Sequence, residues 1–295
     1  MPSWGPLGQQ VFNRTYSRPT AEGSESWQQT VSRVVEGNLD LVDAQHIEPL
    51  EATNLARHFE NFSALPAGRH LWVSGVPGRQ FLFNCHRSGF GPNLADHFCF
   101  TFDELMKGGG VGSNYSDSYL EKFPSPAGRV ELAVMVTPSH PDRDEFAHHL
   151  VPSLRDGAVY KVPDSRQGWV EALRRVITLF EDGGGYINID VSDVRPRGAP
   201  ILGFGGTASG PGPLVEMLVG VSDILNDKAG RDLNSLDVME IDHQIASCVV
   251  AGNVRRSARM SIKHWNDPDI FDFISCKSDP NEHWSTNISV EIDAL

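Results

Sequence analysis

The spacing of apolar residues divides the chain into a short helical part and a longer part of mixed strands and helices. Between Trp27 and about Leu65 the apolar residues recur at roughly helical spacing, with a break at Pro49. Beyond this point the apolar runs are short and punctuated by glycine, which indicates short strands and loops. These runs lie at 72–73, 81–83 and 98–102. We therefore predict a helical N-terminal region over residues 1–65 and a larger domain over residues 66–295.

The larger domain contains three amphipathic helices and several runs with strand character. The clearest helix has apolar residues on one face, Ser165 as its N-cap and Gly183 after its end. The helices are predicted at about 166–181, 213–230 and 235–252. The strands are predicted at 130–136, 158–162, 186–191, 259–262 and 288–292. Because strands and helices alternate, we expect an α/β domain with largely parallel strands.

Composition and charge exclude several kinds of partner. The chain has 295 residues, of which 40% are hydrophobic and 21% charged, so it can bury a core of its own. A formal net charge of −13 argues against direct nucleic-acid binding, which needs broad basic surface. We also expect no membrane partner, because the N-terminus lacks an export signal and no long apolar run is present.

The cysteine and histidine spacing predicts no metal site and no disulfide framework. The cysteines stand at 85, 99, 248 and 276 without a CxxC pair, which favours reduced thiols and a cytoplasmic location. Cys99 and Cys248 fall among apolar residues and are predicted core residues, whereas Cys276 is predicted near a surface loop. The histidines at 140, 148 and 149 lie in an acidic stretch and are interpreted as solvated or capping residues.

Cys85 is the first candidate for chemistry. It follows the strand-like run 81–83 and precedes a polar loop that begins at Arg87. A thiol at the end of a strand is well placed for reactivity. A cysteine at such a position is, however, more often a small packed residue, and this alternative stays open on the local pattern alone.

Three further segments could bind a ligand. At 102–116 a short helix runs into glycines whose backbone could approach a phosphate or sugar, although neither a Walker motif nor GxGxxG is present. At 204–214 a glycine-rich loop leads into a helix, whose N-terminus favours an anion. At 251–259 three arginines gather, which suits phosphate or carboxylate partners. The alternative for 102–116 is a flexible loop, and for 204–214 it is a connector without a ligand. For 251–259 the alternative is surface salt bridges.

Taken in order, these motifs resemble the N-terminal half of the adenosylcobalamin-dependent (class II) ribonucleotide reductases. The resemblance extends from about residue 10 to the end of the chain. It rests on 65–69, 71–72, 84–85, 106–116, 168–169, 190–196, 203–213, 249–258 and 284–290. The fold implied by the resemblance is the first part of a ten-stranded α/β barrel made of two half-barrels, preceded by a small helical region.

The resemblance also implies a reaction. In this family a thiyl radical, started by adenosylcobalamin, removes the 3′-hydrogen of a ribonucleotide, and the 2′-hydroxyl leaves as water. Two further cysteines supply electrons and a proton and end as a disulfide; by position Cys85 resembles the first of this pair. Asn84 and Cys85, with Gly109 and Gly110, are then expected to line the substrate site. Ribonucleoside triphosphates are the expected substrates.

A regulatory nucleotide and a reductant are implied as partners. The stretch 113–124 is expected to bind a deoxynucleotide effector that sets substrate choice. The residues assigned to this role are Ser113, Asn114, Tyr115, Ser116, Asp117 and Lys122. A thioredoxin-like protein is the expected reductant of the cysteine pair.

The chain departs from the family pattern at its end. The radical cysteine lies in an Asn-x-Cys-x-Glu type segment in this family, and none occurs before Leu295. The second redox cysteine, most of the cobalamin site and the thiols that accept electrons are likewise expected beyond Leu295. On this interpretation the chain needs the missing C-terminal part of the reductase for turnover. A truncated record, a split gene and an inserted element would each explain the pattern.

Two other functions remain open on the sequence alone. One is a nucleotide-binding module without catalysis that is derived from a reductase. The other is a fragment of a reductase of another radical class, started by a diiron protein or a glycyl radical. The residue sequence at 203–213 and 249–256 favours the cobalamin class.

Overall fold

The computed structural model describes residues 4–76, 82–151, 157–201, 207–251 and 258–293. The chain forms two compact units, Met1–Phe83 and Asn84–Leu295. The first unit extends past the boundary predicted at residue 65, because helix α4 (Gly68–Val73) packs on α2 (Trp27–Leu39). Leu71 of α4 is buried in the core of this unit.

The first unit is built around α2. This helix begins with a capping box, in which Ser26 accepts from the amide of Gln29 and the Gln29 side chain accepts from the amide of Ser26. The other elements are α1 (Gly8–Thr15), β1 (Pro19–Thr20), β2 (Gly23–Ser24), η1 (Ala44–His46) and α3 (Glu51–Glu60). The buried core consists of Phe12, Trp27, Val31, Val34, Val35 and Leu71. Helices therefore supply the whole buried core of this unit.

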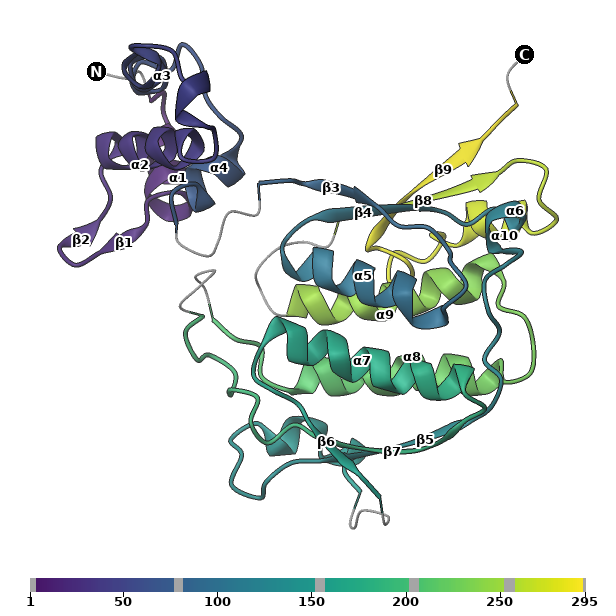
Figure 1. The fold of residues 1–295 in the computed structure, drawn as a ribbon. Coiled ribbons are helices and arrows are strands. Elements are labelled where there is room, and N and C mark those ends of the chain that lie inside the picture. The colour runs from purple at the N-terminus through teal and green to yellow at the C-terminus, as the bar shows by residue number, and fades with distance from the viewer. Residues whose placement is uncertain (1–3, 77–81, 152–156, 202–206, 252–257, 294–295) are drawn as a thin grey trace. The chain divides into compact units, whose positions relative to one another are not determined.

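The second unit has four layers: a sheet, two pairs of helices and a second sheet (Figure 1). The first sheet has the strand order β3-β4-β8-β9 and the second β5-β7-β6, and all neighbouring strands are parallel. The strands are β3 (Cys85–Arg87), β4 (Gly110–Asn114), β5 (Val130–Met135), β6 (Val159–Lys161), β7 (Gly185–Asp190), β8 (Ala258–His264) and β9 (Thr286–Glu291). The prediction of an α/β domain with parallel strands is confirmed.

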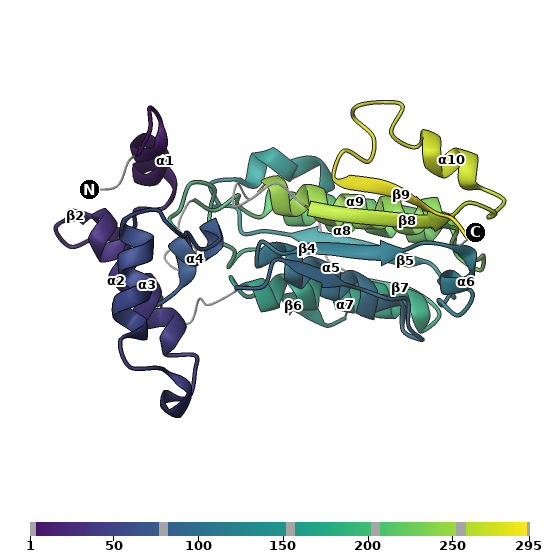
Figure 2. The same cartoon turned by 90° about the horizontal axis from the view of Figure 1, so that it is seen from above.

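Four long helices fill the space between the sheets (Figures 1 and 2). The pair α5 and α9 lies against the first sheet, and α7 and α8 lie against the second. Their bounds are α5 (Leu94–Met106), α7 (Arg166–Glu181), α8 (Gly212–Asp227) and α9 (Ser235–Ala251). The shorter helices are α6 (Asp117–Leu120), η2 (Arg143–His149) and α10 (Ile270–Ser275). None of the helices in the described residues is long and apolar enough to cross a membrane.

The three amphipathic helices lie where the periodicity predicted them. Ser165 caps α7 by accepting from the amide of Gly168, and the apolar stripe of this helix is buried. The prediction of short strands and loops at 72–73 and 98–102 is wrong, since these residues lie in α4 and α5. Neighbours on several sides bury α5, so its run of aromatic residues lacks the polar face that marks a surface helix.

The strands predicted at 130–136, 158–162 and 186–191 form a sheet of their own. They are β5, β6 and β7, with β7 in the middle and Met135 opposite Asp190. They therefore do not continue the sheet that contains Cys85. In the first sheet β8 and β9 pair next to β4, so segments about 150 residues apart in sequence become neighbours.

A buried polar network ties the first sheet to its helices. Asp242 of α9 accepts hydrogen bonds from the Tyr115 hydroxyl at 2.6 Å and lies 2.9 Å from Nε2 of His97 in α5. Arg259 of β8 donates to the Tyr115 oxygen at 2.9 Å. Burial opposes ionisation of Asp242, but His97 and Arg259 outweigh it and lower the pKa of this carboxyl. The paired charges fix α5 and α9 against one face of the sheet.

Candidate functional site

The first residues of the parallel strands β3 and β4, which α5 connects, bring together the residues predicted to line the substrate site. Cys85 lies opposite Gly110 in the parallel register of these strands. The amide of Gly110 donates a hydrogen bond of 2.7 Å to the carbonyl oxygen of Asn84. Gly109 precedes this pair and donates its amide to the carbonyl oxygen of Glu104. The structure therefore places Asn84, Cys85, Gly109 and Gly110 side by side.

Cys85 lies on the face of the sheet that the helices leave open. Its neighbour His86 points to the opposite face, where its Nε2 is 3.3 Å from a carboxylate oxygen of Glu104 in α5. Because successive side chains of a strand alternate between faces, Cys85 points away from α5, and its residue is exposed. Gly110 and Gly112 share this open face, while Val111 between them is buried.

The two glycines leave no room for side chains. A Cβ atom on Gly109 would lie 2.8 Å from the His86 ring, and one on Gly110 would lie 3.1 Å from the carbonyl oxygen of Ala258. The turn can thus approach both β3 and β8 closely. Because Gly110, opposite Cys85, has no side chain, a ligand on the open face would meet backbone beside the thiol.

Cys85 begins β3 and does not follow a strand as predicted; of the run 81–83, residue 81 lies outside the described residues. The three other thiols are buried. Burial raises the pKa of Cys99 to about 12 and also raises that of Cys248. Cys276 is buried at the end of α10, not exposed in a surface loop, and burial raises its pKa. Cys85 is thus the one exposed thiol among the four.

The residues assigned to an effector begin at the other end of β4 and are largely engaged within the protein. Ser113 is buried, and Tyr115 is 1% exposed within the Asp242 network. Asn114 donates to Glu291 of β9 at 2.7 Å and accepts from the amide of Ser116 at 3.0 Å. These contacts connect the end of β4 to β9.

Asp117 and Lys122 complete this stretch. The carboxylates of Asp117, Asp267 and Asp269 converge on the ammonium of the buried Lys263 at 3.0, 3.0 and 2.8 Å. The lysine therefore occupies the position that a cation would take among these three carboxylates. Lys122 is exposed and follows α6.

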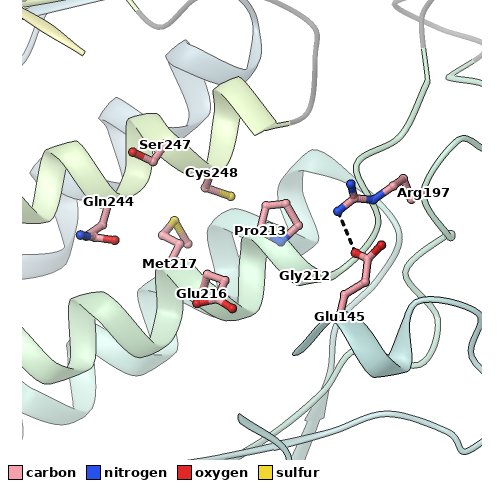
Figure 3. A pocket seen from close by; sticks show the side chains of 9 residues that line it. All are labelled: Glu145, Arg197, Gly212, Pro213, Glu216, Met217, Gln244, Ser247 and Cys248. Atoms are coloured by element: carbon pink, nitrogen blue, oxygen red, sulfur yellow. Dashed lines mark hydrogen bonds and ion pairs between the residues drawn. The ribbon is translucent and has the colours of Figure 1, made fainter. Parts of the chain in front are cut away.

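The first residues of α8, at the end of the glycine-rich segment, border a cavity of about 270 Å³ (Figure 3). It is lined by Glu145, Arg197, Gly212, Pro213, Glu216, Met217, Gln244, Ser247 and Cys248. Arg197 is paired with Glu145 at 2.7 Å, so two carboxylates and one guanidinium line the cavity. The helix N-terminus favours an anion there, while the excess carboxylate opposes it. Residues 204–206 of the predicted loop lie outside the described residues.

Two other sequence interpretations are changed by the structure. His140 is buried, and its Nε2 lies 2.9 Å from the carbonyl oxygen of Val194, so it is not solvated. Of the arginines predicted to gather near residue 255, only Arg259 falls within the described residues, and it is buried in the Asp242 network. His148 and His149 both lie beside Glu216 of α8. No local sequence signal links these histidines to a residue so far along the chain.

Comparison with known proteins agrees with this architecture. The family model for the insertion domain of B12-dependent ribonucleotide reductase matches residues 134–225, which contain η2, β6, α7, β7 and most of α8. The model for the ribonucleotide reductase alpha domain matches residues 1–76. A crystal structure of a B12-dependent (class II) ribonucleotide reductase superposes with a TM-score of 0.88 at 35% identity, over 99% of this chain and 47% of that one.

Curated relatives give the same result. A protein of Mycobacterium phage D29, named provisionally as an adenosylcobalamin-dependent ribonucleoside-triphosphate reductase, is 46% identical over 98% of this chain and 44% of its own length. The adenosylcobalamin-dependent ribonucleoside-triphosphate reductase of Lactobacillus leichmannii is 36% identical over 99% of this chain and 46% of its own. Over 98–99% of its length, the chain is thus similar to B12-dependent ribonucleotide reductases. It spans about half the length of the curated relatives it matches.

Proposed function

We propose that this chain supplies the substrate-facing half-barrel and one redox cysteine of an adenosylcobalamin-dependent ribonucleoside-triphosphate reductase. The observation that carries the proposal is the position of Cys85, exposed on the open face of a parallel sheet directly beside the Gly109-Gly110 turn. The names of the relatives support the substrate class and the cofactor. We propose that the reaction takes place in the cytoplasm, where thiols are kept reduced.

The electron balance explains why an exposed thiol is needed. Replacing a ribose 2′-hydroxyl by hydrogen releases water and consumes two electrons and two protons. Two thiols supply both and become a disulfide. We propose Cys85 as one of these thiols and a cysteine of the remaining half of the reductase as the other. Asn84, Gly109 and Gly110 position the ribose and phosphates against the sheet, and a thioredoxin-like protein reduces the disulfide.

We propose that the main cobalamin site lies outside the described residues. Within the described residues, a cavity of about 270 Å³ lies at the start of α8. It is smaller than the sites of ~300–1,000 Å³ that hold drug-sized ligands, so it does not fit a cobalamin. We propose that the half present in the relatives but absent from the matched region binds adenosylcobalamin, which supplies the radical that starts the reaction.

The test is a reconstituted turnover assay. The chain is mixed with the C-terminal half of a related reductase, adenosylcobalamin, a dithiol and a ribonucleoside triphosphate, and deoxyribonucleotide is measured. Cys85→Ser should abolish product, because serine cannot form the disulfide. Cys276→Ala is the matched control, since this buried thiol lies outside the proposed site and its loss should leave product formation intact. Turnover by Cys85→Ser would disprove the proposal.

We further propose that the stretch 113–124 binds a deoxynucleotide effector. Its support is the exposed Lys122 beside α6 and the link from Asn114 to β9, which shares the open sheet with Cys85. The cavity at the start of α8 is the competing location. Lys122→Ala should weaken deoxynucleotide binding measured by calorimetry, whereas Arg197→Ala should not. The opposite pattern would move the effector to the cavity.

A nucleotide-binding module without catalysis is the second candidate function. Retained deoxynucleotide binding without product in the reconstituted assay would support it.

A further inference from the structure

Two histidines and a glutamate from distant parts of the chain converge beside the cavity at the start of α8. His148 and His149 end the short helix η2, and Glu216 lies in the second turn of α8. The two segments are held together by Phe146, which is fully buried and would contact a Cβ on Gly212 at 3.7 Å. The backbone positions of all three residues are thus fixed by packing.

The side-chain atoms already have the spacing of a coordination shell. Nε2 of His148 is 3.5 Å from one carboxylate oxygen of Glu216, and Nε2 of His149 is 3.0 Å from the other. The ligand atoms of the three residues all lie within 4.8 Å of one another. Tetrahedral ligands at the ~2.0–2.1 Å bond lengths of zinc are separated by ~3.3 Å, which the two observed distances bracket.

We propose that His148, His149 and Glu216 form a site for a divalent transition-metal ion of the zinc type. Two neutral imidazoles and one carboxylate are a ligand set that zinc uses, with an open position for water. The side chain of His148 is 62% exposed, so an ion can enter from solvent and this imidazole can rotate to close the shell. The bound ion would clamp η2 to α8.

The alternative for this cluster is a pair of imidazolium–carboxylate contacts without a metal. Such contacts between exposed groups contribute little stability. The cluster differs from the three aspartates around Lys263, where an ammonium already fills the centre. No cationic side chain is found within ion-pairing distance of Glu216 in the described residues, other than the two imidazoles.

The test is zinc and cobalt binding by the purified chain. We expect one equivalent of Zn²⁺ in competition with a chromophoric chelator, and a Co²⁺ absorption spectrum without thiolate charge-transfer bands. Loss of even an outer-shell partner of a metal site costs ~10–100-fold in affinity, so His149→Gln and Glu216→Gln should each weaken zinc binding by at least about tenfold. Zinc should also raise the Tm of the wild-type chain but not of these variants.

Two control variants separate this site from other ligands. His264→Gln removes another imidazole that pairs with an exposed carboxylate, that of Asp293, and should leave zinc affinity unchanged. Cys85→Ser removes the exposed thiol and should also leave it unchanged. Zinc binding that survives Glu216→Gln, or that disappears in Cys85→Ser, would overturn the proposal. Absence of zinc binding by the folded wild-type chain would overturn it as well.

Discussion

The amide of Gly110 donates a hydrogen bond of 2.7 Å to the carbonyl oxygen of Asn84. This bond lies at the start of the pairing between β3 and β4 and sets Cys85 opposite Gly110. The thiol and the glycine turn are therefore one structural unit. A displacement of the turn would move Cys85 with it. The position of the thiol in the proposed reaction therefore depends on the close fit of the two glycines.

The close fit of Gly109 predicts a loss of stability on substitution. In Gly109→Ala the new Cβ would lie 2.8 Å from the His86 ring and 3.1 Å from the Glu104 carbonyl oxygen. Such overpacking costs ~1–3 kcal/mol, which urea unfolding would measure. Gly89→Ala is the control, because a Cβ there meets nothing within 4 Å. Equal stability of the two variants would show that the turn tolerates a side chain.

The buried hydroxyl of Tyr115 predicts a second effect on stability. Tyr115→Phe removes the donor to Asp242 and the acceptor for Arg259, both of which are buried. A buried hydrogen bond to a charged group contributes ~1.5–3 kcal/mol, and Asp242 and Arg259 keep other partners, so the free energy of unfolding should fall by about this amount. Tyr119→Phe alters a half-exposed ring and should change it by less than ~0.5 kcal/mol. A neutral Tyr115→Phe would mean that the network does not hold the sheet to α9.

Stability should fall as the pH is lowered, in part through His243. Burial, with the nearby His283 and Arg259, lowers the pKa of His243 from its ordinary 6.5 to about 4. Between these values the unfolded chain binds a proton that the folded chain does not. The stability from this group is therefore fully present above pH 6.5 and decreases as the pH falls toward 4.

The measurement is urea unfolding at pH 7 and pH 5. His243→Gln removes the titrating group and should reduce the loss of stability between the two pH values. His264→Gln, at a more exposed imidazole, is the control and should keep the wild-type dependence. An unchanged dependence in His243→Gln would contradict the assignment.

The exposure of Cys85 predicts selective alkylation. Iodoacetamide should modify Cys85 in the folded chain, while Cys99, Cys248 and Cys276 should react only after unfolding, because burial hides these thiols and raises their pKa. Mass spectrometry of peptides after a short exposure would measure the difference. Modification of Cys99 before Cys85 would contradict the arrangement of the first sheet.

Local sequence signals are sufficient to predict an element when its caps and its apolar periodicity lie within the element itself. The helix Arg166–Glu181 was predicted to the residue because its cap, its apolar stripe and its terminal glycines are all local. Helix α5 was missed because contacts with β4, α7 and α9 bury Phe98, Cys99 and Phe102, leaving an apolar run without a polar face. The division into two sheets depends on which strands pair, and pairing is set by contacts distant in sequence.

The same limit applies to the sites. The contact between Asn84 and Gly110 is expected only because the motifs resemble a known family. No local sequence feature of either residue predicts this contact. The spacing of His148 and His149 resembles no standard metal site, and Glu216, which lies 67 residues beyond His149, cannot be placed beside them from the sequence. Tyr115 was assigned to an effector, although its hydroxyl is engaged in the core.

The most direct test of the central proposal is to identify the disulfide formed in a single turnover. The chain and the C-terminal half of a related reductase would be fully reduced, freed of excess dithiol and mixed with adenosylcobalamin and a ribonucleoside triphosphate, then quenched, alkylated and digested. We predict a disulfide between Cys85 and a cysteine of the other half, in a 1:1 ratio with deoxyribonucleotide. Product formed while Cys85 is recovered as the alkylated thiol would contradict its role in the redox pair.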